Sequence, residues 1–193
     1  MTFLIQQALG DDWRQLPRVI QQHYEVSEGR GTCLEGAMTI AYPDSMLPII
    51  WLIHRLGGLV FRRGVNVHTR VEKTGGADVL LHWRRTMSYQ NGKTAHFRSQ
   101  MAYVADHELI ETISYGFGLC LKIDVSNGDL IYRSKGHFWQ WGRIRLTIPD
   151  WLLLGTATIS EQALSDEEFY LDFTIRHHWW GETYSYRGSF RYC

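Results

Sequence analysis

The sequence predicts an α+β fold: a mostly antiparallel, strongly curved or barrel-like sheet of about 9–11 strands, with N-terminal helices packed on it. Three observations predict it. Apolar residues recur at helical spacing in the first 60 residues, apolar and polar residues alternate from Gly64 onward, and Asn-Gly pairs mark hairpins in the second part. The 193 residues fit one domain over 1–193, helical in 1–60 and a β-meander in 61–193.

The first two dozen residues are predicted to be helical. Apolar side chains recur every three to four positions over 3–8 and again over 16–24. Gly10 ends the first of these stretches, and Pro17 is tolerated only near the start of the second. Helices from this region are expected to pack on the sheet or to plug it.

The segment Gly29–Gly36 is rich in glycine, but it follows a helix and lacks the Lys-Ser/Thr pair that closes a phosphate-binding loop. A bend that leads into a strand fits it better. Asp44 or Ser45 can cap a further helix, which stays apolar up to the stop signal Gly57-Gly58. Because this helix is apolar on nearly every side, we expect it to be buried against the sheet.

Turn signals divide the rest of the chain into strands. Asn91-Gly92 is a strong hairpin signal, Ser126–Asp129 repeats it, and Ala105–Glu108 forms a weaker turn. Three successive hairpins make a meander. Further strand-like runs follow at Thr156–Ala163, Phe169–His178 and Thr183–Arg191.

Composition and charge exclude several classes of protein. Hydrophobic residues make up 45% of the chain and charged residues 21%, which is typical of a globular protein. Twenty basic and twenty acidic side chains cancel, so neither nucleic acid nor an anionic membrane is an expected partner. The most apolar stretch, Met46–Phe61, is too short to span a bilayer, and a peripheral membrane contact is left open for it.

The cysteines and the N-terminus indicate a cytoplasmic protein. Cys33, Cys120 and Cys193 are odd in number, far apart and without paired spacing, so they are predicted to be reduced thiols. The N-terminus has no basic region ahead of an apolar run, so no signal peptide is predicted. No metal-ligand spacing and no cofactor motif is present, and we expect neither a metal nor a cofactor.

Register arguments predict a ligand site on the hairpin around Asn91-Gly92. If that pair is a two-residue loop, Arg85 lies opposite Arg98 and Trp83 opposite Gln100. The next turn then places two further side chains on the same face. The predicted ligand-binding residues are Trp83, Arg85, Arg98, Gln100, Glu111 and Tyr115.

Two arginines that face each other repel, so something should compensate them. We hypothesise that Arg85 and Arg98 bind the anionic group of a small amphipathic or lipid-like molecule, whose apolar part lies against the neighbouring aromatic residues. The simpler interpretation, that these arginines pair with protein carboxylates or point into water, is the more common outcome.

Two other functions stay open. The first is an isomerase- or hydrolase-type enzyme that uses Glu111 with His96 or His23, although the catalytic residues are unknown because no nucleophile motif is present. The second is a protein-interaction module without a small ligand.

Trp139 and Trp141 share one face of a predicted strand, and we expect both in the core or in a pocket wall.

Spaced residues over most of the chain resemble an uncharacterised bacterial family, the domain of unknown function 4166. The resemblance rests on Leu16-Pro17 with His23, Gly29-Arg30-Gly31, Trp83-Arg84-Arg85, Phe97-Arg98-Ser99, Glu111, Gly128-Asp129-Leu130, Gly142, Pro149 and Tyr186-Arg187-Gly188. In that family the domain stands alone or follows a dehydrogenase-like domain. The resemblance therefore implies a functional link to a dehydrogenase-like protein, and it implies no activity.

Overall fold

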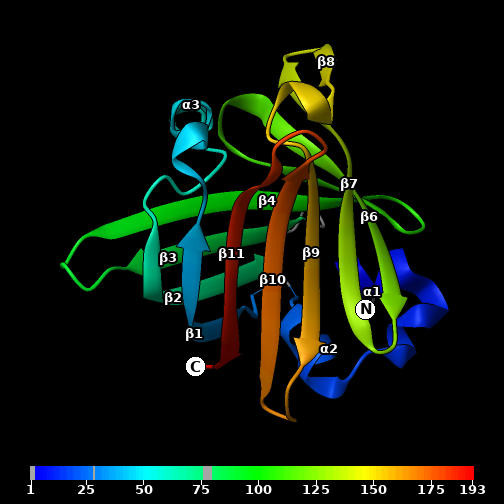
Figure 1. Ribbon diagram of the computed structural model, residues 1–193. Coiled ribbons are helices and arrows are strands. Elements are labelled where there is room, and N and C mark those ends of the chain that lie inside the picture. Colours follow the sequence, from blue (N-terminus) through cyan, green and yellow to red (C-terminus); the bar gives the residue numbers. More distant parts are fainter. Residues whose placement is uncertain (1–2, 28, 76–79) are drawn as a thin grey trace.

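A computed structural model describes residues 3–27, 29–75 and 80–193, and it places the strands in a closed barrel (Figure 1). Ten antiparallel strands close in the order β6-β5-β4-β3-β2-β1-β11-β10-β9-β7, with β7 paired back to β6. The strand β8 pairs with β7 alone and lies outside this closure. The predicted α+β class with a barrel-like sheet is confirmed.

Short helices precede, separate and follow runs of consecutive strands. The helices are α1 (Leu4–Leu9), α2 (Arg18–Tyr24) and α3 (Leu47–Arg55), with single-turn or short 3-10 helices η1 (Gly10–Gln15), η2 (Asp44–Met46), η3 (Ser114–Gly116) and η4 (Asp150–Leu152). The strands are β1 (Thr32–Ala41), β2 (Gly64–Gly75), β3 (Leu81–Ser88), β4 (Thr94–Ala105), β5 (Glu108–Thr112), β6 (Phe117–Ser126), β7 (Asp129–Trp141), β8 (Ile144–Ile148), β9 (Thr156–Ala163), β10 (Glu168–His177) and β11 (Gly181–Tyr192). The strand β1 therefore interrupts the region 1–60, which is not helical throughout.

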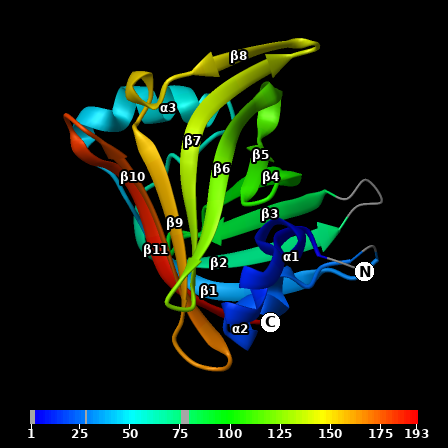
Figure 2. The same cartoon turned by 90° about the vertical axis from the view of Figure 1, so that its right-hand side faces the viewer.

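The N-terminal helices cover one end of the barrel (Figure 2). α1 ends at Gly10, which has a positive φ of 55°, and α2 begins directly after Pro17, as the sequence predicts. α1 packs against β4 and β6, while α2 packs against β1, β9 and β10, so together they bridge the opening. Buried side chains such as Ile5 and Ile20 fill the space beneath them.

The helix α3 differs from its prediction. It lies at the opposite end of the barrel from α1 and α2 (Figures 1 and 2). Ile50 is its one residue in the fully buried class, whereas Trp51 and Leu52 are each 53% exposed. The prediction that α3 is buried on all sides is wrong, because one face lines the barrel opening and the other faces outward. No helix among the described residues is long and apolar enough to cross a bilayer.

The two Asn-Gly hairpins have different loops. Asn127 and Gly128 both have positive φ and form the predicted two-residue loop, with Ser126 paired to Asp129. At the first hairpin, the N–H of Tyr89 donates to the carbonyl of Lys93 (2.9 Å), so three residues form the loop.

That extra residue overturns the predicted register of β3 and β4. Gly92 has a φ of 76° and accommodates the bulge that commonly closes a three-residue loop. Arg98 consequently lies opposite Arg84, and Arg85 lies opposite Phe97. A shift of one residue moves every side chain of a strand to the other face, and Arg85 and Arg98 therefore point to opposite faces of the sheet.

The remaining predicted strands are confirmed within one or two residues as β9, β10 and β11. The β7–β8 hairpin was not predicted. Its two strands extend beyond the barrel (Figure 2). Trp141, which was expected in the core or in a pocket wall, is 74% exposed on this hairpin.

Candidate functional site

A cavity of about 310 Å³ lies inside the barrel. It extends from the floor formed over α2 to the opening between α3 and η4, and its volume falls at the lower end of the usual range for ligand sites. Most of its wall is apolar, including Leu34, Met38, Val71, Met87, Met101, Leu119, Ile159, Phe169, Leu171, Phe173, Ile175 and Phe190. These side chains come from inward positions of the strands, which alternate with outward positions.

The cavity wall carries an ion pair. Nη2 of Arg85 lies 3.7 Å from Oε1 of Glu111, and the two side chains are 16% and 12% exposed. The guanidinium also donates to Oγ of Ser99 (3.1 Å). A separation of 3.7 Å is longer than a hydrogen bond, so both charged groups keep bonding capacity for another polar group.

The indole of Trp83 lies beside this pair. The Arg85 guanidinium lies 4.6 Å from the centre of the Trp83 ring and 5.1 Å from that of Phe97, which is within range of a cation–π interaction. Trp83 is buried and lines the cavity, and its Nε1–H has no hydrogen-bond partner among the described residues. A buried donor without a partner is uncommon and calls for an acceptor.

Two further polar side chains, Tyr186 and His137, line the cavity. Tyr186 on β11 has its pKa raised to about 12 by burial. His137 on β7 places Nδ1 2.8 Å from Oδ1 of Asp150, near the opening. A histidine oriented by a carboxylate is an arrangement that general acid–base catalysts use.

A fully buried polar network forms the floor. Nε2 of His23 lies 2.9 Å from Oε2 of Glu161, and the hydroxyl of Tyr24 donates to Oε1 (2.8 Å). The hydroxyl of Tyr132 donates in turn to that of Tyr24 (2.6 Å), and the ammonium of Lys73 contacts Nδ1 of His23. Tyr24 and Tyr132 also line the cavity, so the network fixes the shape of its floor.

Burial and the neighbouring charged groups together shift the pKa values in this network. Burial and the nearby Lys73 lower the pKa of His23 from 6.5 to about 4, and burial lowers the pKa of Lys73 well below its usual value. Burial alone would raise the pKa of Glu161, but His23, Lys73 and the Tyr24 hydroxyl outweigh it and lower that pKa. A neutral His23 can then accept from Lys73 at Nδ1 and donate to Glu161 through Nε2.

Three of the six predicted ligand-binding residues line the cavity: Trp83, Arg85 and Glu111. Arg98 and Gln100 lie exposed on the outer face because of the register shift.

The other predicted positions also lie away from the cavity. Tyr115 is exposed on η3, with a positive φ of 59°. His96 is exposed and lies 3.3 Å from Oγ1 of Thr86, and His23 bonds to Glu161. Within the described ranges, neither histidine contacts Glu111.

Sequence reasoning missed Tyr186, His137 and the floor network. Their partners lie far apart in the sequence, as the 138 residues between His23 and Glu161 illustrate, and no local pattern connects them. The Tyr186-Arg187-Gly188 cluster was a usable signal for Tyr186, since alternation along β11 directs residues 184, 186 and 190 to one face.

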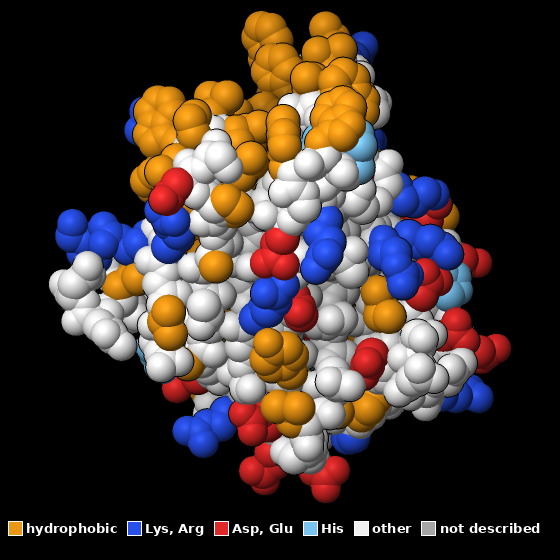
Figure 3. Space-filling model, viewed as in Figure 1, with side chains coloured by type: hydrophobic (Ala, Val, Ile, Leu, Met, Phe, Trp, Pro, Cys, Tyr) orange, Lys and Arg blue, Asp and Glu red, His pale blue; other side chains and the backbone are white. Residues whose placement is uncertain are grey.

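The exposed end of the barrel around the cavity opening is unusually apolar. Figure 3 shows hydrophobic side chains gathered there, above the mixed charges of the barrel wall. We call this surface the apolar crest. It comprises the exposed residues Trp51, Leu52, Trp141, Ile144, Leu146, Trp151, Leu152, Trp179 and Trp180, from α3, the β7–β8 hairpin, η4 and the β10–β11 turn. An open groove of about 1050 Å³ runs beside it, less enclosed than the cavity.

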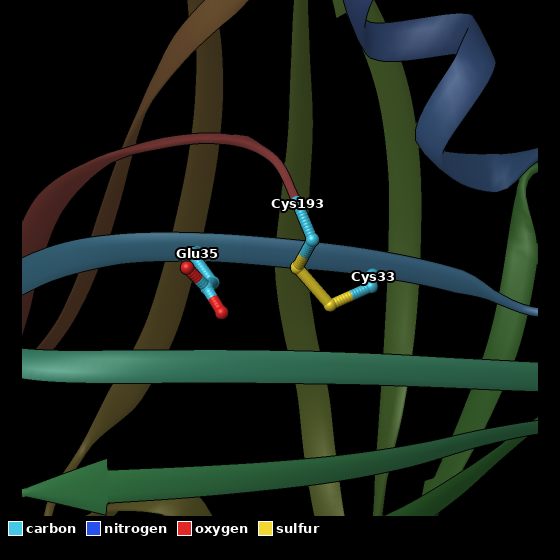
Figure 4. A group of neighbouring side chains, drawn as sticks. All are labelled: Cys33, Glu35 and Cys193. Carbon is cyan, nitrogen blue, oxygen red and sulfur yellow. A yellow bond between two sulfur atoms is a disulfide. The ribbon is translucent and has the colours of Figure 1, made fainter.

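Cys33, Glu35 and Cys193 lie close enough to offer ligand atoms to a metal, within 4.8 Å of one another (Figure 4). However, Cys33 and Cys193 form a disulfide with a Cα–Cα distance of 5.5 Å, so their sulfurs are not thiolate ligands. The prediction of three reduced thiols is wrong for this pair, whereas Cys120 is a free thiol. The strands β1 and β11 bring the two residues together from opposite ends of the chain.

A family model described as a domain of unknown function (DUF4166) matches residues 16–190, nearly the whole chain. The match spans the cavity wall and the floor network, and it confirms the resemblance seen in the sequence. Among curated protein sequences, none matches the chain.

Proposed function

Since the chain belongs to the DUF4166 family, whose description states no activity, we propose a function from the cavity: it binds a small amphipathic or lipid-like molecule inside the barrel. The observation that carries the proposal is an apolar cavity with a small group of polar side chains on one wall. Such a combination is typical of ligand sites, where the apolar wall gives affinity and the polar groups fix orientation.

The polar group of the ligand is proposed to lie against Arg85 and Trp83. Both residues line the cavity wall, and the buried indole N–H of Trp83 has no acceptor among the described residues. An anionic group can accept from the Arg85 guanidinium while its neighbouring atoms pack on the Trp83 ring, and Glu111 can accept from a ligand hydroxyl. The sequence-based hypothesis had two arginines at this point. In the observed register only Arg85, of these two arginines, faces the cavity. Arg98 therefore has no role in the proposal.

An enzymatic function has one observation in its favour. His137 lines the cavity and is held by Asp150, so a bound molecule that reached His137 would meet an oriented acid–base group. This histidine replaces His96 and His23 in the isomerase or hydrolase alternative. Turnover of an extracted ligand by wild-type protein, lost in His137→Gln, would establish it.

The first experiment is native mass spectrometry of freshly purified protein, followed by organic extraction of what it carries. A defined bound mass is expected, and its chemistry names the ligand class. Arg85→Gln should then reduce binding of that ligand about tenfold or more, since a lost hydrogen bond to a charged group is worth about 1.5–3 kcal/mol. The double variant Arg85→Gln with Glu111→Gln restores charge balance and controls for folding.

Arg98→Gln is the matched control, because it removes the same charge from the outer face and should leave binding unchanged. Equal losses in Arg85→Gln and Arg98→Gln would contradict the placement of the polar site. An apo protein that also fails to take up any fatty acid or acyl probe would contradict the proposed function itself.

Location and partner belong to the same proposal. We retain the cytoplasm as the proposed location, although a persistent Cys33–Cys193 bond is typical of oxidising compartments. Trapping thiols in intact cells before lysis tests this directly. The functional link to a dehydrogenase-like protein rests on the family resemblance, and co-purification tests it.

A further inference from the structure

We propose that the apolar crest docks on a lipid bilayer that contains anionic lipids, so that the cavity opens onto the membrane surface. The docking proposal rests on the exposed side chains of the crest alone. The idea that the cavity ligand arrives from the membrane rests on the proposed function.

The first argument is the kind of side chain at the crest. Trp141 and Trp179 are 74% and 68% exposed; Trp141 ends β7, and Trp179 lies in the β10–β11 turn. Extended apolar surface on a soluble protein usually marks an interaction site. Tryptophan in particular is enriched where protein meets the membrane interface, because its ring is apolar and its N–H can bond to lipid head groups or water.

The second argument is charge. Arg55 and Arg143 lie exposed in the crest segments and have no carboxylate partner within the described part of the chain. Of the carboxylates near these segments, Asp150 lies beside His137, and Glu182 at the start of β11 accepts from Arg187 (2.8 Å) and lies 3.7 Å from Arg176. The crest is therefore locally basic in a molecule with a net charge of zero. Cations beside exposed apolar residues are what an anionic membrane surface attracts.

The third argument is continuity with the cavity. Leu52 and Leu152 are more than half exposed at the crest and also line the cavity, so one apolar surface leads from outside to inside. The crest is built from separate projections at the end of the barrel (Figure 3), and two of its tryptophans, Trp151 and Trp179, also line the open groove. A rigid protein partner would have to match these separate projections and the openings between them, whereas a bilayer deforms around projecting side chains. The bilayer is therefore the occupant that these observations favour.

The test is flotation with vesicles of phosphatidylcholine alone or of equal parts phosphatidylcholine and phosphatidylglycerol. The wild-type protein should float with the mixed vesicles, more weakly with pure phosphatidylcholine, and less as salt rises. The double variant Trp141→Ser with Trp179→Ser should bind on the order of tenfold more weakly. Arg55→Gln with Arg143→Gln should lose on the order of tenfold to thirtyfold.

Matched controls change the same chemistry elsewhere. Val104→Ser with Leu164→Ser removes exposed apolar side chains outside the crest, and Lys93→Gln with Arg98→Gln removes exposed cations from the β3–β4 hairpin. Both should float like the wild type. Wild-type protein that binds neither vesicle, or crest variants that bind as well as their controls, would overturn the proposal. Crest-dependent self-association without vesicle binding would do the same, in favour of a protein interface.

Failure of docking and failure of ligand binding are separable. The crest tryptophans named here do not line the cavity, so their variant should retain the extracted ligand when vesicles are absent. Arg85→Gln should lose the ligand and still float. If the wild type docks but carries no ligand under any condition, docking stands and the proposed function falls.

Discussion

Nε2 of His23 lies 2.9 Å from Oε2 of Glu161, and both side chains are buried between α2 and the barrel. The contact joins α2 to β9, and the two residues are 138 positions apart in the sequence. Charged groups in an apolar interior are tolerated only when they are paired and fully hydrogen-bonded. This pair, together with Lys73, therefore contributes to holding α2 against the barrel.

Glu161→Gln should lower the free energy of unfolding by about 3–5 kcal/mol, because it leaves the buried Lys73 and His23 without their carboxylate. Chemical denaturation followed by tryptophan fluorescence measures the change. Glu167→Gln removes an exposed carboxylate and should shift stability by less than about 0.5 kcal/mol. Equal stability of the two variants would show that the network is not a structural element.

Acid should destabilise the protein through His23. Its pKa is depressed to about 4 in the folded protein, from an ordinary value of 6.5, by burial and by Lys73. The stability that a depressed pKa provides is present above pH 6.5 and is lost as pH falls toward 4, because the unfolded chain takes up the proton first. The loss over this window should be on the order of 3 kcal/mol.

Denaturation curves between pH 7 and pH 4 measure that loss. In His23→Gln the loss over the same window should be smaller, whereas His96→Gln, on the exposed outer face, should behave like the wild type. Identical pH dependence in His23→Gln and the wild type would remove His23 from the explanation.

The Cys33–Cys193 bond ties the end of the chain to β1 and closes a loop of 160 residues. Constraining so long a loop lowers the entropy of the unfolded chain, so reduction should lower the free energy of unfolding by about 2–5 kcal/mol. Denaturation with and without a reductant tests this. Cys33→Ser with Cys193→Ser should match the reduced wild type, and Cys120→Ser should stay sensitive to reductant. A double variant as stable as the oxidised wild type would contradict the expectation.

The sequence predicted the class of the fold well, because local signals determine it. Helical spacing ends at Gly10, and the Asn127-Gly128 turn is of the two-residue type. The disulfide and the floor network could not be predicted, since they join residues that only the closed barrel brings together. The exposure of α3 was predicted wrongly for a related reason. A helix that is apolar on all sides can be buried in the core, and it can equally lie at a barrel opening that faces an apolar environment, so the pattern alone does not distinguish the two positions.

The candidate site was predicted in part through two errors that cancel. The first hairpin was shifted by one residue, which reversed the face assigned to β4. The next pairing was also shifted by one, since Met101 and not Ala102 lies opposite Glu111. Two reversals return Glu111 to the face of Arg85, whereas Arg98, on the strand between them, stays misplaced.

Engineered disulfides test this register directly. Arg84 and Arg98 are opposite each other and exposed on the outer face, so the variant Arg84→Cys with Arg98→Cys should form a cross-strand disulfide under mild oxidation. The variant Arg85→Cys with Arg98→Cys should not, because its two side chains point to opposite faces of the sheet. Both are made in Cys120→Ser protein, and mass spectrometry of the peptides measures the bond. Oxidation of the second variant in preference to the first would restore the two-residue loop, and with it a site that contains both arginines.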